Sequence, residues 1–505
     1  MGEKAMAKAA EEDWHVGESV VALIESRARE IGLAAVHRRS MQFEITQFSD
    51  TASYNRVVSH CLFQDPARVL VSRSARGTQL LLLLEQAFPE RLLCLERRHF
   101  DEARGQALLQ ETCVSGLQAP DLEEKFVASA AFAALWHFLE ASNMHLQIPA
   151  VLVRFRVASH SMVIDGSTAR LLELVRGASE PAKSLLGLFA CRTAGGQHLL
   201  RQSLLQPSVQ LPEIQARQQA VEALLRDEPL FFQLQQLLPA LGDLDVLLAR
   251  LSEPSLGSLG SLGSGSDGCK VAARTALRLR NVLAALPLLA DALEAAPKEG
   301  LLEELRTLLG HRRFSELCKE LDRVLDSEGF SQRSQRGSMA HCALMYAVKS
   351  NVSALLDVAR QTWSESMAKI QSTFRVLAAK YPDLRLRLEF AEKRGWFLSH
   401  EAMGIPEAFL HTSLKKNSKG QRSQRAESTT KDLNQENFKL RQAEAEILKR
   451  TAEALGGLLH ELRSEATLLH RASQAAAVLD LIAAFAGYAL SASCVRRGTQ
   501  LQGSR

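Results

Sequence analysis

The first part of the chain alternates short apolar segments with segments of helical periodicity. Apolar runs and strict apolar–polar alternation predict four strands, at residues 20–24, 32–36, 43–48 and 68–72. Helices are predicted after Asp50 and Thr51, which are good capping residues, and around residues 80–88. Because strands alternate with helices, we expect a small α/β domain. We place it at residues 15–122, behind a disordered tail at residues 1–14.

From residue 123 onward, apolar residues recur every three or four positions, which predicts helices. These helices cover residues 126–141, 211–225, 230–251, 272–328 (several segments), a long run through Trp363 to Leu377, 436–470 and 475–489. Between the long run and the helix at 436–470, residues 384–390 alternate between apolar and polar side chains, which predicts a strand. Residues 395–398 have the pattern of its antiparallel partner. A glycine- and serine-rich segment at residues 253–268 has the composition of a flexible loop.

Residues 162–207 have the pattern of several short helices that meet. After a strand-like start, the first helix has Ser167 or Thr168 as its candidate cap. A second helix is predicted to end near Gly195 and Gly196, and a third completes the stretch. We expect this stretch to be a junction in a helical body.

Composition adds one localised feature. Hydrophobic residues make up 46% and charged residues 23% of the chain, as in an ordinary globular protein, and the net charge is +4. Residues 411–431 hold six cations and one acid, so the net charge of this window, +5, is larger than that of the whole chain. Its serine, asparagine and glycine residues predict a mobile, hydrated loop, either suited to phosphate contacts or solvated without a partner. The candidate DNA-binding residues are Lys415, Lys416, Lys419, Arg422 and Arg425.

The sequence argues against other kinds of site. The eight cysteines are scattered without a C-x-x-C pair, which fits neither a zinc site nor a disulfide framework. Residues 263–270 approach a phosphate-binding loop, but Cys269 separates the last glycine from the lysine. Asp50 and Glu44 are the candidate carboxylates for a metal-dependent nuclease, but we expect Asp50 to cap a helix and Glu44 to face solvent on its strand. We therefore expect no metal site and no catalytic residue.

Several motifs together resemble the MutS family. They are Ile164-Asp165, Leu172-Glu173-Leu174, Thr193 with Gly196, the segment 48–54, the segment 349–360 and Leu479-Asp480-Leu481. The similarity is to the meiotic branch of the family, of the homologue-four type. It implies a multidomain, mainly α fold: a small RNase-H-like α/β connector domain, then a large helical core with long lever helices and a small antiparallel-β clamp insertion.

The resemblance also implies where the domains lie. The connector covers residues 15–122, the first part of the core and levers 123–363, the clamp 364–436, the returning helices 437–490 and a frayed tail 491–505. The five candidate cations then lie at the tip of the clamp, the part that closes over DNA in this family.

Two features of the family are not found. The N-terminal domain with a Phe-x-Glu mismatch wedge does not fit before the connector, and Phe43-Glu44 lies in a predicted strand and is not that wedge. No G-x-x-x-x-G-K-S/T motif occurs in the 505 residues. We therefore expect no ATP hydrolysis and no cofactor in this chain, whereas intact family members use ATP and Mg²⁺.

The resemblance implies a non-catalytic DNA-binding protein of meiotic recombination, located in the nucleus on chromosomes. Such a protein clamps branched, Holliday-junction-like DNA through backbone contacts and promotes crossovers. The expected partners are double-stranded or branched DNA and, as a heterodimer partner, a second MutS homologue of the homologue-five type; no membrane is expected. The alternative is a truncated helical interaction scaffold that binds a MutS partner but not DNA.

Overall fold

The structure, a computed structural model, forms two compact units. Unit 1 comprises Met1–Pro254, Arg278–Lys319 and His460–Arg505, and unit 2 comprises Ser255–Leu277 and Glu320–Leu459. The residues described are 19–37, 40–115, 124–142, 151–157, 160–175, 177, 184–253, 266–328, 330, 343–391, 394–401, 405–416 and 422–492. The tail predicted at 1–14 lies outside these ranges, as do nearly all of the tail at 491–505 and most of the loop at 253–268.

Unit 1 begins with a seven-stranded mixed sheet in the order β5-β4-β1-β2-β3-β7-β6. The strands are β1 Ser19–Glu25, β2 Glu30–His37, β3 Gln42–Ser49, β4 Pro66–Ser72, β5 Leu92–Leu95, β6 Cys113–Ser115 and β7 Leu152–Phe155. The first three pair antiparallel, whereas β4, β5, β7 and β6 join in parallel. The four strands predicted from the apolar pattern correspond to β1 to β4. The three short strands β5, β6 and β7 were not predicted.

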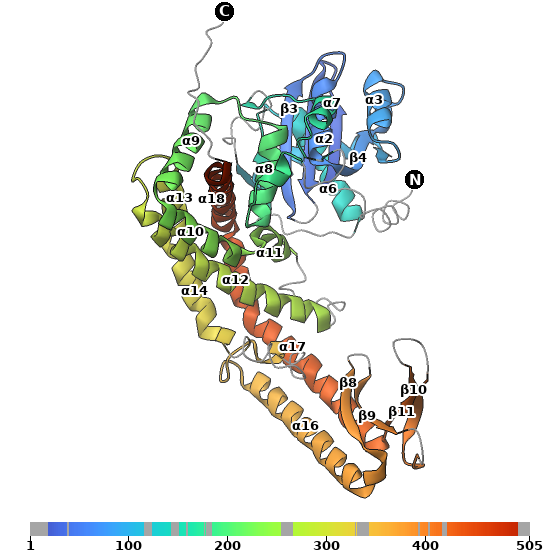
Figure 1. The fold of residues 1–505 in the computed structure, drawn as a ribbon. Helices are drawn as coiled ribbons and strands as arrows, with labels where there is room; N and C mark the ends of the chain where they lie inside the picture. The colour runs from blue at the N-terminus through green and yellow to red at the C-terminus, as the bar shows by residue number, and fades with distance from the viewer. Residues whose placement is uncertain are drawn as a thin grey trace, which may run out of the picture. The chain divides into compact units, whose positions relative to one another are not determined.

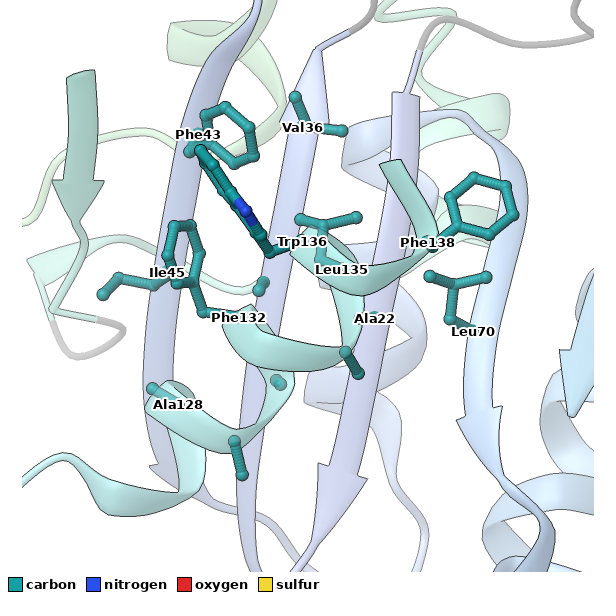
Figure 2. Packing of buried hydrophobic residues seen from close by; sticks show 14 of the residues in the cluster. Ala22, Val36, Phe43, Ile45, Leu70, Ala128, Phe132, Leu135, Trp136 and Phe138 are labelled. Atoms are coloured by element: carbon teal, nitrogen blue, oxygen red, sulfur yellow. The ribbon is translucent and has the colours of Figure 1, made fainter. Parts of the chain in front are cut away.

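Helices cover both faces of this sheet, because successive strand residues point to opposite sides. On one face, α6 Phe126–Ala141 packs Phe132 and Trp136 against Phe43 of β3, with ring centroids 5.6 and 5.9 Å from that ring (Figure 2). Small residues let this helix lie close to the sheet. At Gly32 of β2, for example, an added methyl group would overlap the backbone of Val127 in the helix. On the other face lie α2 Asn55–Gln64 and α3 Gln79–Ala87. The short helix α4 Glu102–Glu111 packs beside α6.

The position of α6 differs from the expectation. The sequence pattern assigns residues 126–141 to the helical core, whereas the helix lies on the sheet (Figure 1). The strand β7, which follows the helix in the sequence, also belongs to this sheet. The reason is that α6 is apolar around most of its circumference, with twelve buried residues, so periodicity could not say which layer it covers. The domain boundaries as a whole stay a prediction.

The two carboxylates weighed as nuclease ligands have structural roles. Asp50 Oδ2 accepts a hydrogen bond from the backbone N of Val57 at 2.9 Å and so caps α2, although the residue at the cap position is Tyr54. The expectation that Glu44 faces solvent is wrong: its side chain is 14% exposed, 3.4 Å from Arg156, and accepts from Gln64 at 2.6 Å. Burial raises the pKa of Glu44, but the charges of Arg156 and its neighbours outweigh burial and hold that pKa below its usual value.

The rest of unit 1 is helical and centred on α18 Ala466–Ala492. The helices that contact it are α8 Ala194–Leu205, α9 Leu211–Arg226, α10 Glu228–Leu237, α11 Leu244–Leu251 and α13 Leu301–Leu309 (Figure 1). By length and composition α18 could cross a membrane, but 56% of its apolar window is buried inside the protein. Its apolar character is therefore accounted for by its place at the centre of a helical core.

The described residues of the stretch at 162–207 form short helical segments, as predicted, but several details differ from the prediction. No strand forms at its start, and α7 Gly166–Leu171 is capped by Asp165, whose carboxylate accepts from the backbone N of Ser167 and Thr168 at 2.9 Å. Gly195 and Gly196 begin α8 rather than ending a helix, because Thr193 caps it. The helix predicted at 230–251 is interrupted at Leu238–Leu241, which contains Pro239, and by Gly242 at φ +57°.

Unit 2 contains two long helices, α16 Ala354–Lys380 and α17 Lys431–Ser464, the last turn of which belongs to unit 1. Two further helices, α12 Ser266–Ala292 and α14 Arg312–Val324, also have residues in both units. The helix predicted at 436–470 is divided, since α17 ends at Ser464 and α18 begins at Ala466. These long helices and the small sheet described next confirm the multidomain, mainly α fold class.

Candidate nucleic-acid interface

A four-stranded antiparallel sheet separates α16 from α17 in the sequence of unit 2 (Figure 1). Its order is β10-β11-β9-β8, with β8 Arg387–Ala391, β9 Gly395–Glu401, β10 Leu410–Lys416 and β11 Arg422–Thr429. The pair predicted from residues 384–390 and 395–398 is present as β8 and β9, in a register that places Leu388 opposite Leu398.

The basic window forms two of these strands, so the expectation of a mobile loop is wrong for most of it. Lys415 and Lys416 are the last residues of β10, and Arg422 is the first of β11, opposite Lys416 in the register. Lys419 lies outside the described residues, between the two strands. The polar sequence conceals the strands because β11 also pairs with β9, and that ladder stabilises a strand with little apolar pattern of its own.

Arg425, the fifth candidate, is held within the sheet. Its Nε donates to Ser399 Oγ at 3.1 Å, and its Nη2 donates to the backbone oxygens of Ser399 at 3.0 Å and Arg385 at 3.3 Å. These bonds join β11 to β9 and to the residues before β8. The side chain is half-buried. Arg425 therefore contributes to the architecture of the sheet, whatever charge it also offers to a ligand.

Two further described cations at the sheet, Arg394 and Arg385, lie beside acids. Arg394 Nη1 is 3.0 Å from Glu427, the single acid of the basic window, and Arg394 also donates to the backbone oxygen of His411. Arg385, 79% exposed, is 3.5 Å from Glu401, an exposed pair that contributes little to stability. These two pairs neutralise charge on the part of the sheet nearer β8.

A buried polar chain joins β9, β10 and β11. His400, fully buried, has its Nδ1 2.8 Å from the backbone oxygen of Glu401 and its Nε2 2.7 Å from Ser428 Oγ. Ser428 Oγ is in turn 3.0 Å from Thr412 Oγ1. Since an amide oxygen only accepts, Nδ1 is the protonated nitrogen and Nε2 accepts from Ser428. This chain fixes the hairpin of β10 and β11 on the rest of the sheet.

The described residues contain no group of three or more His, Cys, Asp or Glu side chains that could hold a metal ion. Lys415, Lys416 and Arg422 belong to two adjacent strand ends of this sheet, and cationic sequences of this kind are typical of proteins that contact an extended polyanion.

Comparison with known proteins gives the family. A family model described as MutS domain III matches residues 167–486, more than half of the chain, including most of the stretch at 162–207 and the whole four-stranded sheet. The chain belongs to the MutS family. MutS protein homolog 4 of Mus musculus is 27% identical over 498 residues, covering 94% of this chain and 50% of that protein.

Other relatives extend the same pattern. DNA mismatch repair protein MSH4 of Arabidopsis thaliana is 26% identical, over 95% of this chain and 62% of that protein. DNA mismatch repair protein MutS of Nostoc punctiforme is 28% identical over 46% of this chain. The chain spans about half the length of the MutS protein homolog 4 relatives from mouse and human.

Two residues that position the sheet were missed in the sequence. His400 stands in a short strand without any distinguishing motif. Asn437 lies between Leu433 and Leu440 on the buried stripe of α17, and its side-chain amide bonds both backbone atoms of Trp396. A polar residue on an otherwise apolar helical stripe is the signal that could have identified Asn437, because a buried amide needs hydrogen-bond partners.

Proposed function

We propose that this chain is a DNA-binding MutS-family protein of meiotic recombination, which holds branched, Holliday-junction-like DNA and so promotes crossovers. Membership of the family and the similarity to MutS protein homolog 4 over 94% of the chain support the meiotic assignment. The observation that carries the DNA-binding part is the β10–β11 hairpin, where Lys415, Lys416 and Arg422 stand on adjacent strand ends with Lys419 between them in the sequence.

Binding of this kind depends on the phosphate backbone rather than on base sequence. Lysine and arginine on a hairpin reach phosphates without a fixed geometry, and each neutralised phosphate releases counterions. Affinity should then depend steeply on salt and weakly on sequence. A second MutS homologue, of the homologue-five type, is the proposed partner, and the nucleus is the proposed location. For these 505 residues the proposed activity is DNA binding without ATP hydrolysis.

The test is a titration against a four-way DNA junction and a matched duplex at several salt concentrations. The test variant replaces four cations by glutamine: K415Q, K416Q, K419Q and R422Q. Its plot of log affinity against log salt should be flatter by about 3 to 4 units, because each lost phosphate contact removes about 0.9 from the slope. Arg425 is left in place, since its bonds to Ser399 and Arg385 support the sheet.

The matched control removes the same charge elsewhere. It replaces four exposed cations of unit 1: Arg73, Arg76, Arg98 and Lys298. Its affinity should fall only slightly, with the salt slope of the unmodified protein. Affinity that is independent of salt, or an equal loss in both variants, would rule out the hairpin as the DNA contact.

One observation favours the alternative of a protein-binding scaffold. A groove of about 310 Å³ in unit 1 is lined by residues of α10, α18 and the segment 188–192. Two of its apolar lining residues, Leu188 and Phe232, are 50% and 56% exposed. Exposed apolar side chains around a groove are typical of protein contacts. Salt-independent or undetectable DNA binding together with stable binding of a second MutS homologue would favour this function.

A further inference from the structure

Asn437 is a buried amide in the second turn of α17. Its side chain is 6% exposed, and it stands on the stripe formed by Leu433 and Leu440, which are 1% and 2% exposed. A buried amide without partners is costly, so the position of Asn437 on this stripe depends on the hydrogen bonds that it makes.

Both ends of the amide bond one residue of β9. Asn437 Oδ1 accepts from the backbone N of Trp396 at 2.9 Å, and Nδ2 donates to the backbone oxygen of Trp396 at 2.7 Å. The β11–β9 ladder reaches Leu398 opposite Ser428, and β11 ends at Thr429. Continued in register, the ladder would place residue 430 opposite Trp396. The amide of Asn437 therefore supplies the donor and acceptor that another strand residue would have supplied.

Glycine at the preceding position makes this approach possible. Gly395 has φ +82°, a conformation that side chains disfavour, and a methyl group there would lie 2.8 Å from Asn437 Oδ1 and 3.1 Å from Cγ. Two weaker links lie beside it: Thr430 Oγ1 accepts from the backbone N of Leu433, and Thr429 Oγ1 is 3.0 Å from Asn434 Oδ1. The first two turns of α17 are thus fastened to the ends of β9 and β11.

We infer that Asn437 is the positioning residue that fixes the orientation of the four-stranded sheet on α17. With the amide in place, the sheet and the helix form one body, and the strand ends of β10 and β11 keep one orientation relative to α17. Without it, the links at Thr429 and Thr430 and the chain connections remain, and the sheet can tilt on the helix. The consequence for DNA rests on the proposed function; the coupling of sheet and helix does not.

The coupling is measured by a distance between two spin labels, one replacing Arg387 on β8 and one replacing Gln442 on α17, both exposed positions. Labels are introduced as unnatural amino acids, because the chain has eight cysteines. Pulsed electron paramagnetic resonance on the full chain without DNA should give a narrow distribution of the distance between the two labels. N437A should broaden it about twofold, while Q435A, an exposed position on the same helix, should leave it unchanged.

A second variant, N437D, has nearly the same size as asparagine and tests the donor alone. It keeps the acceptor for the N of Trp396 but places a carboxylate oxygen against the Trp396 oxygen, so its distribution should be at least as broad as that of N437A. A distribution for N437A as narrow as that of Q435A would overturn the inference. So would broadening in N437A accompanied by loss of the helical signal in circular dichroism, because misfolding would then explain it.

The DNA arm uses the same proteins with a four-way junction. N437A should bind about tenfold more weakly with an unchanged salt slope, because the same cations remain but must be ordered on binding. If the unmodified chain fails to bind DNA, the proposed function fails, and the distance measurement still decides the role of Asn437. Broadening without any change in DNA affinity would overturn the consequence for DNA, because binding would then not depend on a fixed orientation of the sheet.

Discussion

Asp480, in the middle of α18, caps α8 through Thr193. The carboxylate oxygen Oδ2 accepts from both the backbone N and the Oγ1 of Thr193 at 2.7 Å, across 287 positions of sequence. The other carboxylate oxygen, Oδ1, accepts from the backbone N of Arg192 at 2.9 Å, and Asp480 is fully buried. The positive end of α8 and three donors compensate the buried charge. Two motifs that identify the family are thus the two halves of one contact.

Replacing Asp480 by alanine should strongly destabilise unit 1. The change leaves the donors of Arg192 and Thr193 buried without their acceptor, and removing one partner of such a contact costs about 3 kcal/mol or more. Thermal unfolding measures the loss of stability, and amide hydrogen exchange around residues 192–196 measures the local loss of protection. E299A, at an exposed acid, is the control and should change neither. Unchanged protection of the two amides in D480A would contradict the capping role.

Gly196 should tolerate no side chain, whereas Gly457 should. A methyl group on Gly196 would overlap Oδ2 of Asp480, while one on Gly457, exposed in α17, has nothing within 4 Å. G196A should therefore destabilise by about 1 to 3 kcal/mol. G457A should stabilise by about 0.5 to 1 kcal/mol, because alanine restricts the unfolded chain. Equal effects of the two changes on the unfolding midpoint would contradict the close approach of Asp480.

The fold could be predicted where local pattern and family motif agreed. Strands β1 to β4 have apolar patterns strong enough to be recognised in the sequence. The helix α16 is long, and its apolar residues recur every three or four positions, so it too can be recognised. The strands β5, β6 and β7 have only three or four residues each, too few for a periodicity. Their existence depends on parallel pairing with distant neighbours, which no local pattern encodes.

The local structure predicted for the candidate site is wrong, and its role in DNA binding stays a prediction. The excess of positive charge singled out residues 415–425 as candidates. Their lysines, serines and glutamines have no apolar alternation, so the sequence does not predict a strand there. The strand conformation of β11 depends on its pairing with β10 and β9. Glu44 in unit 1 is a second case in which the local pattern misleads. Its position in a strand of alternating apolar and polar residues predicts a solvent-exposed side chain. Arg156, from the segment after β7, covers it instead. Tertiary neighbours overrode local pattern in both places.

Unit 1 should lose stability as the pH falls from 7 to 5. Burial, together with the charge of Arg156 for His60 and of His37 for His198, lowers the pKa of both His60 and His198 from 6.5 to about 4. Between these values the unfolded chain binds protons that the folded chain does not, so acidification favours unfolding. Each histidine should contribute about 2 kcal/mol to the loss between pH 7 and pH 5.

The measurement is the free energy of unfolding of unit 1 at pH 7 and at pH 5. A double variant, H60Q with H198Q, should show a smaller drop between the two pH values than the unmodified chain, whatever its stability at pH 7. H460Q, at an exposed histidine, should keep the full drop. A drop of the same size in all three proteins would show that neither buried histidine is responsible.

Arg360 should not tolerate replacement by lysine. Its guanidinium, 8% exposed, donates from Nε and Nη2 to the backbone oxygen of Met345 at 2.9 and 2.7 Å, and from Nη2 to that of Val348 at 2.7 Å. Its Nη1 lies 3.5 Å from Asp357, which also accepts from the backbone N of Asn351. One planar group thus ties the chain before α16 to the first turns of that helix.

A lysine ammonium cannot reproduce this fork, because its three donors diverge from one atom. R360K should therefore destabilise unit 2 by about 1.5 to 3 kcal/mol, since at least one buried carbonyl loses its donor. R375K, on the exposed side of α16, is the matched control and should stay within about 0.5 kcal/mol. Hydrogen exchange of peptides covering residues 343–363 should rise in R360K alone. Equal exchange in the two variants would mean that the helix start is held by its apolar contacts, such as Leu356 and Trp363, and not by the arginine.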